Sequence, residues 1–232
     1  MLPGSASGWR GSAAQALIFL AAATTASGFG GQIASSPLRS SRTACESKRA
    51  KSDSLVKMSS DVPKIVAFDL DATLWVPEMY ELWGGGAPFT KQPDGTLKDR
   101  SGRTCRMMGN TAALLLELNT DPKWKDSKVA YCSCTDEPSW AAECMRLFEV
   151  GEGINMDKAA PIKQIFKSSK SEHFRRIHEA TGVPYNKMIF FDNEEHNCRT
   201  VSKLGVTCIY TPRGMTEGEW KRGLQEYSKN NK

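Results

Sequence analysis

The feature that most constrains this chain is a pair of carboxylates at the end of an apolar run. Asp69-Leu70-Asp71-Ala72-Thr73 follows directly on Lys64-Ile65-Val66-Ala67-Phe68. Such an apolar run is typical of a strand buried on both faces of a parallel sheet. In an open α/β sheet, ligands bind beyond the carboxyl ends of the strands, where two nearby carboxylates can share one ligand. Taken alone, the motif is equally consistent with an acidic turn.

Three further short apolar runs predict strands of the same sheet, at residues 128–132, 187–191 and 206–210. Helical patterns lie between the strands, at residues 110–118, 138–148, 171–180, 194–204 and 216–228. Strands that alternate with helices predict an α/β fold with a doubly wound, mainly parallel sheet and helices on both faces.

Residues 75–105 interrupt this alternation with a Gly/Pro-rich, aromatic insert. Its Asp94-Gly95 pair predicts a hairpin turn. The run Gly84-Gly85-Gly86 lacks the strand-to-helix context of a phosphate loop, so a structural role is favoured for it. Because the insert follows the Asp pair, we expect it to shape the entrance to a site there.

The charges divide the 232 residues into a basic leader and a neutral body. Residues 1–60 hold seven of the 31 Lys and Arg and two of the 26 acidic residues, which leaves 24 of each sign in residues 61–232. A nucleic-acid partner requires clustered basic charge on the folded surface, so nucleic acid is set aside as a partner. We predict one domain at residues 61–232, preceded by a leader.

The leader has two parts. Residues 1–28 show the layout of a secretory signal peptide, with an apolar stretch too short to span a bilayer, so we expect no stable membrane insertion of the mature chain. Residues 29–60 have either transit-peptide composition or that of a disordered leader. This order resembles the bipartite presequence of algae with secondary plastids and predicts a plastid location. Translation from Met58 would instead give a cytoplasmic protein.

The cysteines and histidines predict neither a disulfide framework nor a zinc site. Seven scattered cysteines are odd in number, and no Cys-x-x-Cys pair occurs. The one close pair, Cys132 and Cys134, is interpreted as part of a strand end.

Polar side chains stand at the ends of three predicted strands, all on one edge of a parallel sheet. To the Asp pair the later strand ends and one helix start add Ser133, Thr135, Lys170, Asp192, Asn193, Glu194 and Glu195. A chance motif would not bring a hydroxyl, a lysine and a second acidic cluster to matching positions, so this edge is interpreted as an active site. Thr135 is either a rival of Ser133 or a cap of the next helix. Lys170 is either a site residue or a solvated charge.

The order of these parts resembles the haloacid-dehalogenase (HAD) superfamily, whose four motifs match Asp69-Leu70-Asp71-Ala72-Thr73, Ser133, Lys170 and Asp192-Asn193. Within it the chain is most similar to the magnesium-dependent phosphatases, given FDLDATLW at 68–75 and Phe190-Phe191-Asp192. The resemblance covers most of residues 61–229. It implies a HAD-like Rossmannoid fold with a small hairpin flap and no large cap domain.

The resemblance implies a phosphoric monoester hydrolase that acts through an aspartyl-phosphate. Asp69 is the expected nucleophile, and Asp71 is the expected general acid and base. Lys170 adds positive charge over the nucleophile and the phosphate, which Ser133 and Cys134 would also bind. Cys134 stands where the family commonly has Arg.

Mg²⁺ is the cofactor that the resemblance implies, because two anions approach each other only with a cation between them. Its expected ligands are the Asp69 carboxylate, the Asp71 backbone carbonyl, Asp192 and Asn193. Asn193 stands where the family commonly has a second Asp, so we expect weaker metal binding.

The expected partner is a phosphorylated small molecule or a phosphoprotein. The resemblance implies protein phosphotyrosine or a phosphorylated sugar adduct on an amine. A phosphotransferase and a non-catalytic phosphate-binding module on the same fold are the alternatives. We expect a monomer.

Overall fold

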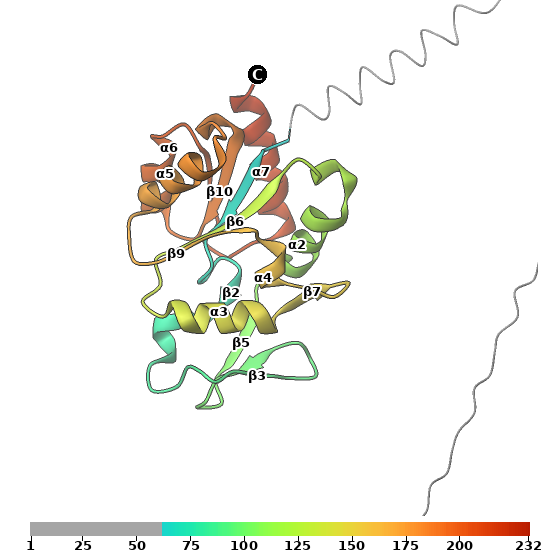
Figure 1. Cartoon of the computed structure of the whole chain (residues 1–232), viewed down its shortest axis with the longest axis vertical. Helices are drawn as coiled ribbons and strands as arrows, with labels where there is room; N and C mark the ends of the chain where they lie inside the picture. Colours follow the sequence, from blue (N-terminus) through green and yellow to red (C-terminus); the bar gives the residue numbers. More distant parts are fainter. Residues whose placement is uncertain (1–61) are drawn as a thin grey trace, which may run out of the picture. The chain divides into compact units, whose positions relative to one another are not determined.

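The computed structural model describes residues 62–232, and the predictions made for residues 1–28 and 29–60 lie outside them. Five parallel strands form the central sheet in the order β11-β10-β1-β6-β9 (Figure 1). Their bounds are β1 (Ile65–Phe68), β6 (Lys128–Ser133), β9 (Ile162–Ile165), β10 (Met188–Asp192) and β11 (Thr207–Tyr210). The four predicted strands are confirmed within one or two residues at each end.

Strand β9 was not predicted from the sequence. Its residues Ile162-Lys163-Gln164-Ile165 pair only with β6, at one edge of the sheet, and none of the four is buried. An edge strand needs less apolar surface than a central one, so its polar residues gave no continuous hydrophobic signal.

Helices cover both faces of the sheet, as predicted. On one face α2 (Thr111–Thr120) and α7 (Glu217–Asn230) pack over the strand residues that include Val66 and Phe68. On the other face α5 (Lys170–Thr181) and α6 (Glu195–Ser202) pack over Ile65 and Ala67. Because successive strand residues point to opposite faces, the continuous apolar run of β1 fills both clusters.

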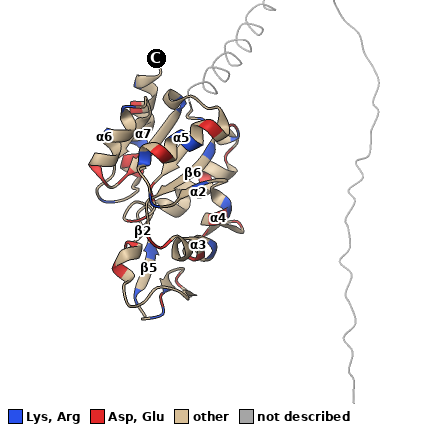
Figure 2. Cartoon of the chain, turned by 60° about the vertical axis from the view of Figure 1, so that its left-hand side comes forward, with Lys and Arg blue, Asp and Glu red and all other residues tan. Residues whose placement is uncertain are grey.

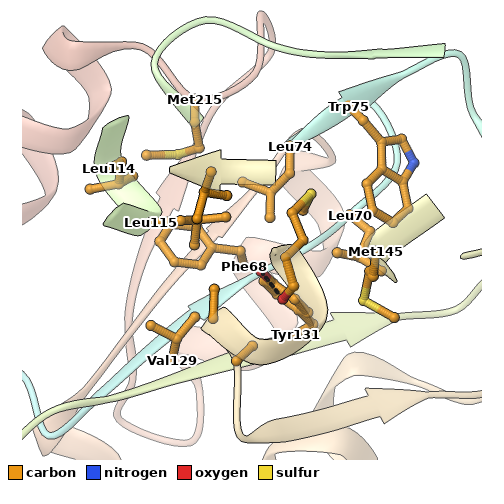
Figure 3. Packing of buried hydrophobic residues seen from close by; sticks show 14 of the residues in the cluster. Phe68, Leu70, Leu74, Trp75, Leu114, Leu115, Val129, Tyr131, Met145 and Met215 are labelled. Carbon is orange, nitrogen blue, oxygen red and sulfur yellow. Dashed lines mark hydrogen bonds between the residues drawn. The ribbon is translucent and has the colours of Figure 1, made fainter. Parts of the chain in front are cut away.

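The larger core cluster joins the sheet to the segment that follows β1 (Figure 3). Phe68 stacks on Phe191 with ring centroids 5.4 Å apart, and Trp75 stacks on Phe148 at 6.1 Å. The Tyr131 hydroxyl donates to the Met156 carbonyl oxygen at 3.0 Å. Helices α3 (Pro138–Leu147) and α4 (Met156–Ala159) complete this side, together with the hairpin of β7 (Glu149–Gly151) and β8 (Ile154–Asn155). The Trp75 ring is therefore fixed in the core.

The insert after β1 folds into a small antiparallel flap in the order β2-β5-β4-β3. Its elements are β2 (Trp75–Val76), the 3₁₀ turn η1 (Met79–Leu82), β3 (Thr90–Lys91), β4 (Leu97–Lys98) and β5 (Thr104–Met107). The predicted turn is confirmed, since Gly95 has φ of 82° and the Asp94 carboxylate accepts the Thr96 amide N–H at 2.9 Å. Gly86 has φ of 77°, and a Cβ there would lie 2.3 Å from the Trp140 ring, which gives the glycine run the structural role that was favoured.

Basic and acidic residues are interspersed along the ribbon of the described domain in the view of Figure 2. No helix within residues 62–232 is both long enough and apolar enough to cross a bilayer.

His173 makes the stability of the domain depend on pH. Its Nε2–H donates to the Phe166 carbonyl oxygen at 3.0 Å, and Nδ1 is buried with no partner among the described residues. Burial lowers the pKa of His173 from 6.5 to about 4. Between these values the unfolded chain binds a proton that the folded chain does not, so the free energy of unfolding falls as the pH falls.

We expect the native chain to lose about 2 kcal/mol more stability than His173→Gln between pH 7 and pH 5. Glutamine retains a donor toward Phe166 but does not titrate. Urea unfolding of both proteins at each pH measures the difference, and equal losses would show that His173 has no depressed pKa.

Candidate active site

A cleft of about 410 Å³ lies at the carboxyl ends of β1, β6 and β10. The sequence-predicted residues that line it are Asp69, Asp71, Ser133, Cys134, Thr135, Lys170, Asn193 and Glu194. Parallel strands bring these residues to one edge of the sheet although they are spread over more than a hundred positions. The predicted juxtaposition is therefore present in the fold.

Lys170 and Asp69 form a buried ion pair at the base of the cleft. Lys170 Nζ contacts Asp69 Oδ1, donates to the Cys132 carbonyl oxygen at 2.5 Å and lies 3.6 Å from Asp192 Oδ2. Burial alone would lower the pKa of Lys170, but the charges of Asp69 and Asp192 outweigh it and raise that pKa. Lys170 is only 4% exposed, so the alternative of a solvated charge is wrong.

The backbone of α5 places this lysine. Ser169 is the N-cap residue of the helix, and its hydroxyl accepts the Glu172 N–H at 3.2 Å. Lys170 is therefore the first helical residue, which directs its side chain back toward the strand ends.

Asp71 is held by an indole group of the core. Trp75 Nε1–H donates to Asp71 Oδ1 at 2.7 Å. Between them Ala72 has φ of 54°, a left-handed backbone conformation that a non-glycine residue rarely adopts. Burial and the nearby charge of Asp69 raise the pKa of Asp71 to about 7. A carboxyl group with this pKa can both give and accept a proton near neutral pH.

Thr73 shapes the loop and does not line the cleft. Its hydroxyl accepts the Asn193 backbone N–H at 3.0 Å and lies 3.4 Å from Asp69 Oδ2, and its side chain is fully buried. Thr73 thus ties the end of β1 to the end of β10.

Asn193 supplies an oxygen to a candidate magnesium site. Its side-chain oxygen lies 3.2 Å from the Asp71 carbonyl oxygen and 3.3 Å from Asp69 Oδ2. Adjacent oxygen ligands of Mg²⁺ are about 3 Å apart, so the Asn193 oxygen lies at ligand spacing from each of the other two. Turning the amide by half a turn places its NH₂ group there instead, donating to the same two oxygens. Within residues 62–232, no three His, Cys, Asp or Glu side chains gather as candidate metal ligands.

Asp192, the other predicted ligand, lies behind the cleft. Its side chain is fully buried and accepts the Glu194 backbone N–H at 2.7 Å and the Asn197 amide at 3.1 Å. Burial and the charge of Asp69 raise the pKa of Asp192 to about 7. Through these contacts Asp192 orients Lys170 and the turn after β10. Direct binding of the metal by Asp192 stays a prediction.

The loop after β6 holds the residues that were predicted to contact phosphate. Ser133 is 2% exposed, and its hydroxyl accepts the Thr135 N–H at 3.3 Å. The Cys134 thiol lines the cleft and donates to the Ser168 carbonyl oxygen at 2.9 Å. Thr135 accepts the N–H of Glu137, the N-cap residue of α3, at 3.1 Å, which supports its helix-capping role. Ser133 is then the better donor to a phosphoryl oxygen.

Eight cleft residues were not predicted as part of the site from the sequence: Glu78, Tyr80, Asp136, Ser168, Ser169, His196, Asn197 and Thr200. The first two come from the flap, which therefore borders the entrance as expected. The last three lie on the first turns of α6. Their positions three or four residues apart, counted from Asn193, are the sequence signal that could have placed them on the helix face toward the cleft. Glu195 begins α6 but does not line the cleft.

Comparison with known proteins identifies the family to which this chain belongs. The model of the acid phosphatase family matches residues 61–230. The chain belongs to the acid phosphatase family. It is also 34% identical over 171 residues to human "Magnesium-dependent phosphatase 1", a match that covers 72% of this chain and 89% of the relative.

Two more distant similarities accompany this match. The "HAD-like hydrolase superfamily protein P8B7.31" of Schizosaccharomyces pombe is 34% identical over 159 residues, which cover 64% of this chain and 86% of that protein. A solved structure of the N-terminal part of protein BF1531 from Bacteroides fragilis is described as containing a phosphatase domain complexed with Mg. It aligns with this chain at 17% identity and a TM-score of 0.49, over 76% of this chain and 43% of that one. The family match and the two relatives that are 34% identical confirm the predicted membership of the HAD phosphatases.

In this acid phosphatase we expect Asn193→Asp to bind Mg²⁺ roughly tenfold more tightly, because a charged oxygen replaces a neutral one in the same position. Isothermal titration with Mg²⁺, or the rise of Tm with Mg²⁺ concentration, measures the change without any turnover. Asn155→Asp, at the N-cap of α4, is the matched control and should leave Mg²⁺ binding unchanged. Equal affinity of the Asn193→Asp and native proteins would exclude Asn193 as a ligand.

Proposed function

We propose that the chain is a Mg²⁺-dependent hydrolase of phosphate monoesters that acts through an aspartyl-phosphate on Asp69. The observation that carries this proposal is the placement of Asp69, Asp71 and Lys170 around one cleft, with the lysine paired to the first carboxylate. The name of the human relative, and the Mg in the described Bacteroides phosphatase domain, agree with it.

In the first step, a carboxylate oxygen of Asp69 attacks phosphorus and the bond from phosphorus to the ester oxygen breaks. The leaving oxygen takes the proton of Asp71. Lys170 and the Ser133 hydroxyl stabilise the negative charge on the phosphoryl oxygens. Transfer of a phosphoryl group depends mainly on such positioning and charge neutralisation.

In the second step, Asp71 accepts a proton from water, and the water oxygen attacks phosphorus. The bond from phosphorus to Asp69 breaks, inorganic phosphate leaves, and Asp71 is protonated again. Asp69, Asn193 and the Asp71 carbonyl would hold Mg²⁺, which when bound supplies positive charge between the carboxylate and the phosphate.

The proposed substrate is protein phosphotyrosine or a phosphorylated sugar or amine adduct. The flap that follows β1 is small, and the cleft opens between Tyr80 of the flap and the start of α6. An entrance of this kind admits a phosphorylated side chain or a small molecule.

Two alternatives use the same residues: transfer of the phosphoryl group to an acceptor other than water, and phosphate binding without turnover. An alcohol added to the assay as acceptor distinguishes the first, since a transferase forms the new ester instead of inorganic phosphate. The second predicts no turnover at all.

We expect residues 58–232 to hydrolyse p-nitrophenyl phosphate only with Mg²⁺, and Asp69→Asn to lower kcat by on the order of a thousandfold or more. Borohydride reduces an acyl phosphate to an alcohol, so quenching during turnover should convert residue 69 to homoserine, detectable by peptide mass spectrometry. Asp126→Asn, at an exposed carboxylate far along the chain from the motif, is the control. Turnover that survives in Asp69→Asn would sink the proposal.

We expect Trp75→Phe to impair proton transfer by Asp71, because the ring stays in the core but the N–H that holds the carboxylate is lost. An alkyl phosphate needs protonation of its leaving oxygen more than p-nitrophenyl phosphate does. Trp75→Phe should therefore lower kcat for the alkyl phosphate by a factor on the order of ten times larger than the factor for p-nitrophenyl phosphate.

Trp124→Phe is the matched control, since its indole donates to Glu117 at 3.0 Å, outside the cleft. Equal losses with both substrates would mean that Trp75 serves packing alone.

A further inference from the structure

Asn197 lies in the first turn of α6 and lines the cleft, but the proposed chemistry gives it no part. Its side-chain NH₂ group donates to Asp192 Oδ1 at 3.3 Å, to Asp192 Oδ2 at 3.1 Å and to Glu194 Oε2 at 2.9 Å. One amide group is thus shared by two carboxylates, of which Asp192 is fully buried and Glu194 is exposed. Asn197 therefore joins the end of β10 to the residue that precedes α6.

The buried carboxylate of Asp192 depends on this amide. Its side chain is 0% exposed, so water does not replace a donor that is lost. Its other contacts are the Glu194 backbone N–H, which donates to Oδ1 at 2.7 Å, and Lys170 Nζ, which lies 3.6 Å from Oδ2. Without the amide, the negative charge on Oδ2 would be balanced by Lys170 alone.

Lys170 lies within reach of two carboxylates, and phosphoryl transfer needs it on the first of them. Its Nζ contacts Asp69 and lies farther from Asp192. A hydrogen bond to Asp192 satisfies part of the charge of that carboxylate and weakens its attraction for the ammonium group. Loss of the amide would therefore draw Lys170 toward Asp192 and away from Asp69, the expected nucleophile.

The same amide fixes the turn that carries Asn193. It binds the side chains of Asp192 and Glu194, which stand on either side of Asn193 in the sequence. The side-chain oxygen of Asn193 is the contribution of this turn to the candidate magnesium site. Groups that orient a metal ligand without touching the metal typically change metal affinity by about ten- to a hundredfold.

We propose that Asn197 is a positioning residue of the phosphatase site. Its amide keeps Lys170 on Asp69 by way of Asp192, and it keeps Asn193 at the magnesium site by way of the turn. Asn197 acts through these neighbours and not by contact with the substrate or the metal. This inference rests on the proposed function and adds one residue to its machinery.

Asn197→Leu tests this role, since leucine keeps the branched shape of asparagine and has no donor. We expect Mg²⁺ affinity, measured by isothermal titration without substrate, to fall about tenfold. We expect kcat for p-nitrophenyl phosphate at saturating Mg²⁺ to fall by on the order of tenfold as well. If Asn197→Leu does not fold, Asn197→Ala removes the same donor without adding volume and is measured in its place.

Asn119→Leu is the matched control. Its amide donates to the Leu115 and Ala159 carbonyl oxygens at 2.7 and 3.1 Å, and Asn119 does not line the cleft. This variant also loses an amide that makes more than one hydrogen bond. Its Tm should fall, whereas its Mg²⁺ affinity and its kcat should keep their native values.

A double-mutant cycle separates positioning from a general loss of structure. Asp192→Asn removes the charge through which Asn197 acts on Lys170. In the Asp192→Asn protein, Asn197→Leu should therefore lower kcat by less than about threefold, against about tenfold in the native chain. If Asp192→Asn has no measurable turnover, the affinity for inorganic phosphate with Mg²⁺ gives the same cycle, because Lys170 also attracts the free anion.

The outcomes separate this inference from the proposed function. Native Mg²⁺ affinity or native kcat in a folded Asn197→Leu protein overturns the inference and leaves the function intact. Equal losses in the native and Asp192→Asn backgrounds do the same. Absence of any Mg²⁺-dependent hydrolysis by the native chain refutes both.

Discussion

The buried contact between Lys170 and Asp69 is the interaction on which the cleft depends. A lone carboxylate or ammonium group at this depth would be strongly disfavoured, so each of the two requires the other. The pair also determines which elements must meet, since one partner follows β1 and the other begins α5. Asp192 reinforces it from the end of β10, and the Cys132 carbonyl does so from β6. Three strand ends are thereby tied to one ammonium group.

Around this contact, other side chains fix the positions of the reacting groups and take no part in the proposed reaction. Thr73 links the loop after β1 to the backbone after β10, and Trp75 anchors Asp71 to the core. The flap is attached to the same loop, so its residues reach the mouth of the cleft without a separate cap domain. The stacked rings of Phe68 and Phe191 lie immediately below the two loops and fix their spacing.

The sequence predicted the central strands and the residues at their ends because continuous apolar runs and strand-end polar groups are local signals. It did not predict β9, whose Lys163 and Gln164 lie at a sheet edge where little burial is needed. Nor did it separate the roles of Asp192 and Asn193, because neighbouring residues at a strand end point in different directions and only the fold shows which one faces the cleft. Glu78 was missed for a related reason: its place at the mouth depends on how the flap folds back.

The two departures from the family pattern are coupled by charge. Cys134 stands where the family commonly has Arg, and Asn193 where it commonly has Asp, so one positive and one negative charge are missing from the same cleft. Removal of only the cation would leave a phosphate group facing excess carboxylate, whereas removal of both leaves the balance around Lys170 and Asp69 unchanged.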